Sequence, residues 1–142
     1  EDLLDSTLRE LIDDWESRLS SEGTLLDVLL QYLPMDQLRQ RDLRAWVAFY
    51  NRSLVDEEAA AYIRKFYAEA KNKLSEYLVT YEGKPRKDAE EITIAIQTAV
   101  DGLAFRALGD LESWPPQKQK AQLEATVNRL INPDAANRPY RE

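Results

Sequence analysis

Apolar residues recur at steps of three and four along most of this chain, the spacing that places them on one face of a helix. No segment of the sequence alternates between apolar and polar residues with the period of two that is typical of a strand. Four glycines and six prolines separate the periodic stretches. The pattern predicts an all-α protein in which each helix turns one side toward a shared core.

Three helices are expected in the first part of the chain. The first covers Leu4 to Leu19. The second covers Leu25 to Leu33, and the spacing of Thr24 and Asp27 at its start is typical of a capping box. Because this second segment is apolar on nearly all sides, we expect it to lie in the centre of the protein. The third helix runs from an N-cap at Asp36 to about Val55.

Three further helices and a tail are expected in the rest of the chain. The fourth helix covers Glu57 to Tyr81, and a turn that contains glycine and proline separates it from the fifth, Arg86 to Leu108. The sixth begins at two consecutive prolines and covers about Pro116 to Ile131. Residues 132–142 carry two prolines and several charges, so we expect a flexible C-terminal tail.

The apolar positions of the third, fourth and sixth helices are expected to face the core. On these helices they are Leu38, Leu43, Trp46, Val47, Tyr50, Leu54, Ile63, Phe66, Tyr67, Ala70, Leu74, Tyr77, Leu78, Tyr81, Ala121, Leu123, Val127, Leu130 and Ile131.

The fifth helix carries two different stripes. One is a regular apolar face made of Ile92, Ile96, Val100, Leu103 and Ala107. The other consists of very small residues, namely Ala95, Ala99 and Gly102. A glycine within a helix costs roughly 1 kcal/mol relative to alanine, so we expect close packing to compensate for it. The small residues therefore predict a dedicated interface with another helix.

Composition narrows the classes of function. The 142 residues suit one domain, and the chain contains neither cysteine nor histidine, which excludes disulfides, thiol nucleophiles and histidine-based metal or catalytic sites. A net charge of −7 makes the chain a poor ligand for nucleic acid by itself. No apolar run approaches the ~20 residues of a membrane span. We expect a cytoplasmic protein that is not an enzyme and that needs no metal or cofactor.

Several landmark segments occur in a recognisable order. They are Leu8–Leu11 on the first helix, Leu43–Tyr50 on the third, and Ala89–Ile96 followed by Val100–Leu103 and Arg106 on the fifth. In this order they resemble the C-terminal regulatory domain of TetR-family transcriptional repressors, in particular its BetI-like branch. The resemblance extends over nearly all of the predicted helices.

The resemblance implies a fold and an assembly. The fold is a six-helix orthogonal bundle over residues 1–131, which binds a small effector and forms a homodimer. The last two long helices would build a four-helix bundle with those of the partner. Effector binding would release the intact protein from operator DNA. The candidate interface residues are Ala95, Ala99, Gly102, Arg106, Leu123 and Val127.

Aromatic residues of the third to fifth helices are the candidates for effector binding. They are Trp46, Phe49, Tyr50, Phe66, Tyr67 and Phe105. They either form an ordinary core or wall a ligand cavity. Tyr50 and Tyr67 are the preferred candidates, because a buried phenol needs a hydrogen-bond partner that a ligand can supply. Such rings suit a lipophilic effector, or a cationic one through cation–π contacts.

One acid in this region has two interpretations. Asp101 lies on an otherwise apolar side of the fifth helix, next to Gly102. It is either an acid at the rim of the interface that pairs with Arg106, or a polar contact to the effector or to the partner subunit.

The sequence departs from the family pattern in two ways. It contains no helix-turn-helix module, and it starts at Glu1 with Met35 as its single methionine. We therefore expect a longer protein whose N-terminal module contacts operator DNA. After Asp101-Gly102-Leu103, branch members often carry a large aromatic residue, whereas here Ala104 precedes Phe105, which predicts a differently shaped pocket.

An alternative interpretation is a helical adaptor domain that binds another protein and has no ligand pocket. A rise in melting temperature on ligand addition would favour the regulator, and the absence of such a rise across a broad library would favour the adaptor.

Overall fold

The computed structural model describes residues 6, 9–10, 13 and 23–133, and no strand occurs among these residues. They form the helices α2 (Leu25–Leu30), α3 (Gln37–Ser53), α4 (Glu57–Glu82), α5 (Arg86–Gly109) and α6 (Pro116–Ile131). The all-α prediction is confirmed for this part of the chain. The expected first helix and the expected tail fall mainly outside the described residues, so the count of six helices stays a prediction.

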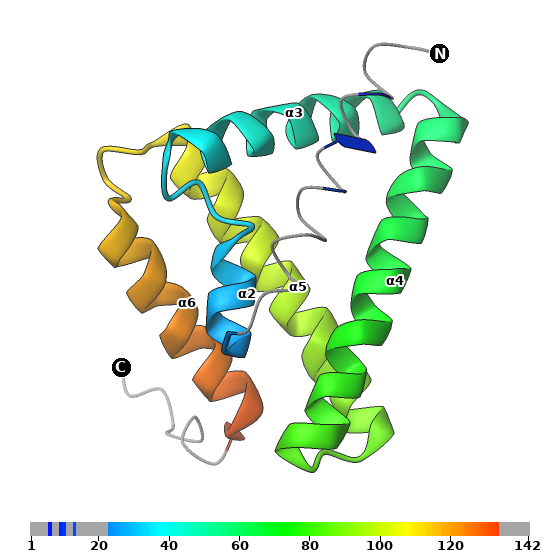
Figure 1. The fold of residues 1–142 in the computed structure, drawn as a ribbon, viewed down its shortest axis with the longest axis vertical. Helices are drawn as coiled ribbons and strands as arrows, with labels where there is room; N and C mark the ends of the chain where they lie inside the picture. Colours follow the sequence, from blue (N-terminus) through cyan, green and yellow to red (C-terminus); the bar gives the residue numbers. More distant parts are fainter. Residues whose placement is uncertain (1–5, 7–8, 11–12, 14–22, 134–142) are drawn as a thin grey trace, which may run out of the picture.

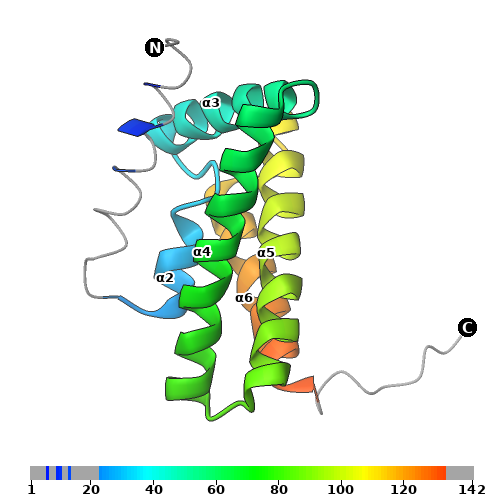
Figure 2. The same cartoon turned by 90° about the vertical axis from the view of Figure 1, so that its right-hand side faces the viewer.

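Three long antiparallel helices give the domain its shape (Figure 1). α5 packs between α4 and α6, while α3 crosses the ends of α4 and α5 that lie away from the turn joining them. The short α2 contacts α6, and Figure 2 shows it to one side of α5 and α6. Figure 2 shows α4 and α5 side by side along most of their length. α5 is therefore the central helix, and its two sides meet different surroundings.

Local signals in the sequence set where the helices begin and end. The capping box of α2 is present: the backbone N–H of Asp27 donates to Thr24 Oγ1 at 3.2 Å, and that of Thr24 donates to Asp27 Oδ2 at 3.0 Å. Asp36 and Asp56 cap α3 and α4 as expected. α4 ends at Gly83, whose φ of 64° lies in the left-handed region that glycine adopts without strain. These caps explain why the starts of α3 and α4 and the end of α4 fall close to the predicted ones.

The second helix is shorter than predicted. It ends at Leu30, and the next three backbone N–H groups bond to carbonyls three residues earlier, which tightens the chain into a turn. Pro34 accounts for this difference, because proline has no N–H to donate to the carbonyl of Leu30 and its ring clashes with a helical carbonyl four residues earlier. Leu33 is nevertheless completely buried, so the segment is central as expected.

Four positions expected to face the core are exposed instead. Leu38, Leu54 and Tyr81 are 48%, 69% and 73% exposed, and Ala121 on α6 is also exposed. Leu38 and Tyr81 lie in the end turns of α3 and α4, and Leu54 follows the last residue of α3. Periodicity predicts the direction of a side chain, but neighbouring helices do not extend over the ends of α3 and α4. Ala121 lies further inside α6, on its exposed side.

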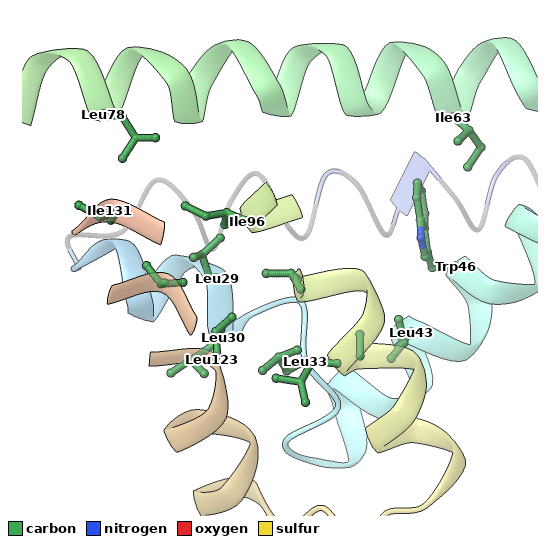
Figure 3. Packing of buried hydrophobic residues seen from close by; sticks show 14 of the residues in the cluster. Leu29, Leu30, Leu33, Leu43, Trp46, Ile63, Leu78, Ile96, Leu123 and Ile131 are labelled. Carbon is green, nitrogen blue, oxygen red and sulfur yellow. The ribbon is translucent and has the colours of Figure 1, made fainter. Parts of the chain in front are cut away.

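The core joins all five helices of the described region. Figure 3 shows Leu30 and Leu33 close to Leu123 of α6, while Trp46 of α3 points toward Ile63 of α4. Ala104, at the position where a large aromatic was noted as typical of the branch, is buried in this core. Other residues of the chain therefore already fill the space around the Ala104 side chain.

By length and composition alone, α5 is the one helix of the described part that could cross a membrane. One third of its most apolar stretch is buried within the chain. A helix at the centre of a bundle commonly has the same composition. The observation therefore identifies α5 as the most apolar of the long helices.

Candidate functional site

Three aromatic side chains meet near the junction of α3 and α4. The ring centroids of Trp46 and Phe66 lie 4.7 Å apart, those of Trp46 and Tyr67 6.3 Å, and those of Phe66 and Tyr67 5.7 Å. These separations are typical of favourable tilted and edge-to-face pairs. Trp46, Phe66 and Tyr67 are called the aromatic cluster below. Three of the six predicted effector residues are thus brought together.

A polar pair connects this cluster to α5. The Tyr67 hydroxyl donates a hydrogen bond of 2.7 Å to Asp101 Oδ2, and both residues are partly buried. The Gln97 amide, one turn before Asp101 on α5, donates to the backbone carbonyl of Tyr67 at 3.3 Å. Two side chains of α5 therefore hold the same residue of α4, which fixes the position of the phenol.

Burial dominates the electrostatics of the pair. It raises the pKa of the Asp101 carboxyl above its ordinary value, and the hydrogen bond from Tyr67 opposes this shift. Burial also raises the pKa of the Tyr67 phenol, with the neighbouring Asp101 acting in the same direction. The phenol consequently stays protonated and serves as a hydrogen-bond donor.

The other predicted effector residues differ in their placement. Phe49 is 2% exposed and belongs to the core, where its ring lies 6.0 Å from that of Tyr62. Tyr50 is partly buried and lies near enough to Tyr67 to affect its pKa. Phe105 is 43% exposed and lies one turn after Asp101 on α5, and no ring contact between it and the cluster occurs among the described residues. The structure therefore brings Tyr50 near the cluster and leaves Phe105 apart.

The pairing of Asp101 with Arg106 that the sequence allowed is absent. The Arg106 guanidinium lies over the ring of Trp114, 5.6 Å from its centroid, while Asp101 accepts from Tyr67. The reason for preferring Tyr67 also needs correction, because its hydroxyl already has a partner within the chain. One signal pointed to the pair, since Asp101 is an acid on an otherwise apolar side of its helix.

The predicted interface residues fall into two groups. Ala95 and Ala99 are partly buried and Gly102 and Arg106 are exposed, on the side of α5 turned away from its own core. Leu123 and Val127 are 1% and 6% exposed, because α6 turns them into the chain's own core. Because both side chains are buried, Leu123 and Val127 have little surface left for contact with another chain.

The exposed side of α5 carries apolar side chains beside the exposed polar residues Glu91 and Thr98. Ile94 is 51% exposed and Phe105 43% exposed. A Cβ atom added at Gly102 would meet no other atom within 4 Å. The outer face of α5 is defined here as Ile94, Ala95, Ala99, Gly102 and Phe105, which lie on one side of the helix.

Comparison with known proteins assigns this all-helical domain to a class. The family model described as "BetI-type transcriptional repressor, C-terminal" matches residues 21–132. The chain belongs to this family, and the resemblance noted in the sequence is confirmed.

A solved structure supports the same assignment. A transcriptional regulator from Rhodococcus sp. Rha1 is 28% identical to this chain and superimposes with a TM-score of 0.79. The match covers 89% of this chain and 70% of the Rhodococcus protein. No curated protein sequence matches the chain. The family and the fold are those of regulators of transcription, which typically have no catalytic activity.

Proposed function

We propose that this chain is the effector-sensing and dimerisation domain of a transcriptional repressor, with residues 1–131 forming the domain. The observation that carries the proposal is the position of Asp101 on α5. Asp101 connects this helix to the aromatic cluster, and it borders the outer face, where Ile94 and Phe105 are exposed. A change at Asp101 can therefore act directly on a surface that suits a second subunit.

The outer face of α5 suits contact with another helix. Exposed Ile94 and Phe105 supply apolar area, and contiguous exposed apolar surface marks sites of interaction. The small side chains of Ala95, Ala99 and Gly102 lie between them and permit close approach of a second backbone. We propose that α5 and α6 pack against the same helices of a second copy. In this arrangement Leu123 and Val127 support α6 from inside.

The effector would bind at the aromatic cluster, with Tyr50 beside it. Its rings suit a lipophilic or cationic compound. An effector that binds one arrangement of the helices more tightly shifts the population toward it, by no more than its difference in affinity. This shift would release operator DNA, which the intact protein would contact through a helix-turn-helix module absent from this sequence. Such a repressor works in the cytoplasm.

The mass of the chain in solution tests the assembly. We expect twice the chain mass of 16.4 kDa by light scattering at micromolar concentration. Gly102→Leu should reduce this to the single-chain mass, because the added side chain occupies the space that the second backbone needs. Ala68→Leu is the matched control, since Ala68 is exposed on α4, away from the outer face. A single-chain mass for the unmodified protein would contradict the proposed dimer.

A further inference from the structure

The carboxylate of Asp101 still depends on water in the single chain. Its Oδ2 accepts the hydrogen bond from the Tyr67 hydroxyl, and no other hydrogen bond or ion pair of Asp101 occurs in the part of the chain that the structure describes. A carboxylate offers about four lone-pair sites on its two oxygens, so most of its acceptor capacity is unused. Because Asp101 is only partly buried, solvent can reach these sites.

The basic residues of α4 do not neutralise this carboxylate. Arg64 and Lys71 lie one turn before and one turn after Tyr67, on the same side of α4. Arg64 pairs with Glu57, and no ion pair of Lys71 occurs among the described residues. The hydrogen bond from Tyr67 is therefore the contact that α4 supplies to the charge.

The other helices around Asp101 supply no counter-ion either. α3 contributes the Tyr50 phenol, which lies near enough to the phenol of the pair to raise its pKa. On α5 itself, the residue one turn before Asp101 is the neutral Gln97, and the Arg106 guanidinium lies over the ring of Trp114. The charged form of Asp101 is therefore stabilised by one hydrogen bond and by solvent, and not by an ion pair within the described residues.

Asp101 borders the surface that a second copy of this chain would cover. It directly precedes Gly102 and lies one turn before Phe105, and both of these residues belong to the outer face of α5. A helix packed on the outer face excludes water from its border. Loss of water disfavours a charged carboxylate more than a neutral carboxyl group. Association of two copies and protonation of Asp101 therefore favour each other.

We propose that protonation of Asp101 strengthens the contact between two copies of this chain, so that the dimer is tighter at acidic pH. This inference rests on the proposed dimer. Burial raises the pKa of Asp101 even in the single chain, and the hydrogen bond from Tyr67 opposes this shift. The dissociation constant of the dimer then rises with pH, from the pKa of Asp101 in the single chain up to its higher pKa in the dimer.

Sedimentation of the 142-residue chain at several concentrations tests the inference. About 0.5 M salt screens the general repulsion between two chains of net charge −7. We expect the dissociation constant to increase about tenfold or more between about pH 5 and pH 8. Asp101→Asn should dimerise as tightly at the alkaline end of this range as at the acidic end. Loss of a merely structural contact would weaken the dimer instead.

Glu91→Gln is the matched control, because it removes an exposed carboxylate from the same side of α5. The dissociation constant of this variant should still rise with pH. If Glu91→Gln rather than Asp101→Asn removes the pH dependence, the inference is overturned. A constant that stays level or falls as pH rises would also overturn it, and a fall would show that the second copy supplies a cation. A single-chain mass at every pH would contradict the proposed dimer itself.

Tyr67→Phe provides a second variant if Asp101→Asn fails to fold. It removes the hydrogen bond that favours the charged form of Asp101. The pH range in which the dissociation constant rises should therefore move upward. An unchanged range in Tyr67→Phe would show that another group titrates, and the inference would be overturned.

Discussion

Asp101 and Gly102 are consecutive in α5 but face different surroundings. Asp101 accepts a 2.7 Å hydrogen bond from Tyr67 of α4, whereas a Cβ atom at Gly102 would meet nothing within 4 Å. Successive residues of a helix are rotated by about 100°, so a single turn reaches both the polar pair and the open surface. A displacement of this turn at Asp101 would therefore move Gly102 as well.

The open space at Gly102 gives a first prediction. Gly102→Ala should raise the free energy of unfolding by about 1 kcal/mol at concentrations where the chain is monomeric, because alanine favours the helix and meets no obstacle. Urea denaturation followed by circular dichroism measures this change. Ala68→Gly, on the exposed side of α4, is the reverse substitution and should cost about the same amount. A destabilised Gly102→Ala monomer would show that the space is occupied.

Ser75 and Thr93 give a second prediction, about the contact between α4 and α5. Both side chains are completely buried, and Ser75 Oγ donates to Thr93 Oγ1 at 3.1 Å. Ser75→Ala alone should cost about 1–3 kcal/mol, because it leaves a buried hydroxyl of Thr93 without this donor. The double variant with Thr93→Val should cost less than the sum of the two single changes. Additive costs in this double-mutant cycle would show that the two hydroxyls do not interact.

Local signals explain why the helices could be predicted well. Asp36 and Asp56 each combine a capping side chain with a following apolar period, so both features agree on where α3 and α4 begin. The premature end of α2 at Leu30 was missed because the effect of Pro34 extends several residues back along the turn. A capping side chain bonds to backbone groups two or three residues away, so a helix start of this kind can be recognised in the sequence.

The site was harder to predict, because it depends on how helices pack. Tyr67 and Asp101 are 34 residues apart, and only the packing of α4 against α5 brings them together. The surroundings of Leu123 and Val127 were also hard to predict from the sequence. Their periodicity indicates an apolar face, but it does not tell whether the chain's own core or a second subunit covers that face.

The buried carboxyl of Asp101 gives a third prediction, about pH. Its pKa is raised by burial, so the folded state binds the proton more tightly than the unfolded state. The contribution of Asp101 to stability should therefore fall as pH rises from the unfolded value of about 3.9 through the folded pKa. Asp101→Asn cannot ionise, so its stability relative to the unmodified chain should increase over this window and then level off.

Asp110 supplies a control of opposite sign. Hydrogen bonds from the Ser113 side chain and backbone lower the pKa of Asp110, so its contribution to stability is lost as pH falls through the folded pKa. Asp110→Asn should consequently become less stable relative to the unmodified chain as pH rises. Urea denaturation at intervals between about pH 3 and pH 7 measures both variants. Equal slopes for the two variants would contradict the assignment of Asp101 as a carboxyl whose pKa is raised by burial.

The amide of Gln119 gives the last prediction. Gln119 is 1% exposed, and its Nε2 donates to the carbonyl of Trp114 at 2.8 Å and to that of Pro34 at 3.4 Å. Its Oε1 has no hydrogen-bond partner in the described part of the chain. In Gln119→Glu a carboxylate would replace the donor and face two carbonyl oxygens, which is an uncompensated buried charge.

Gln119→Glu should therefore destabilise the chain by about 3 kcal/mol or more at neutral pH. The loss should shrink as the pH falls, because a protonated carboxyl can donate to one of the carbonyls and its folded pKa would be raised. Gln122→Glu places the same change on the exposed side of α6 and should cost little at any pH. Thermal unfolding of both variants at neutral and acidic pH compares the two positions. If both lose the same stability at neutral pH, Gln119 does not join α6 to the turn between α2 and α3.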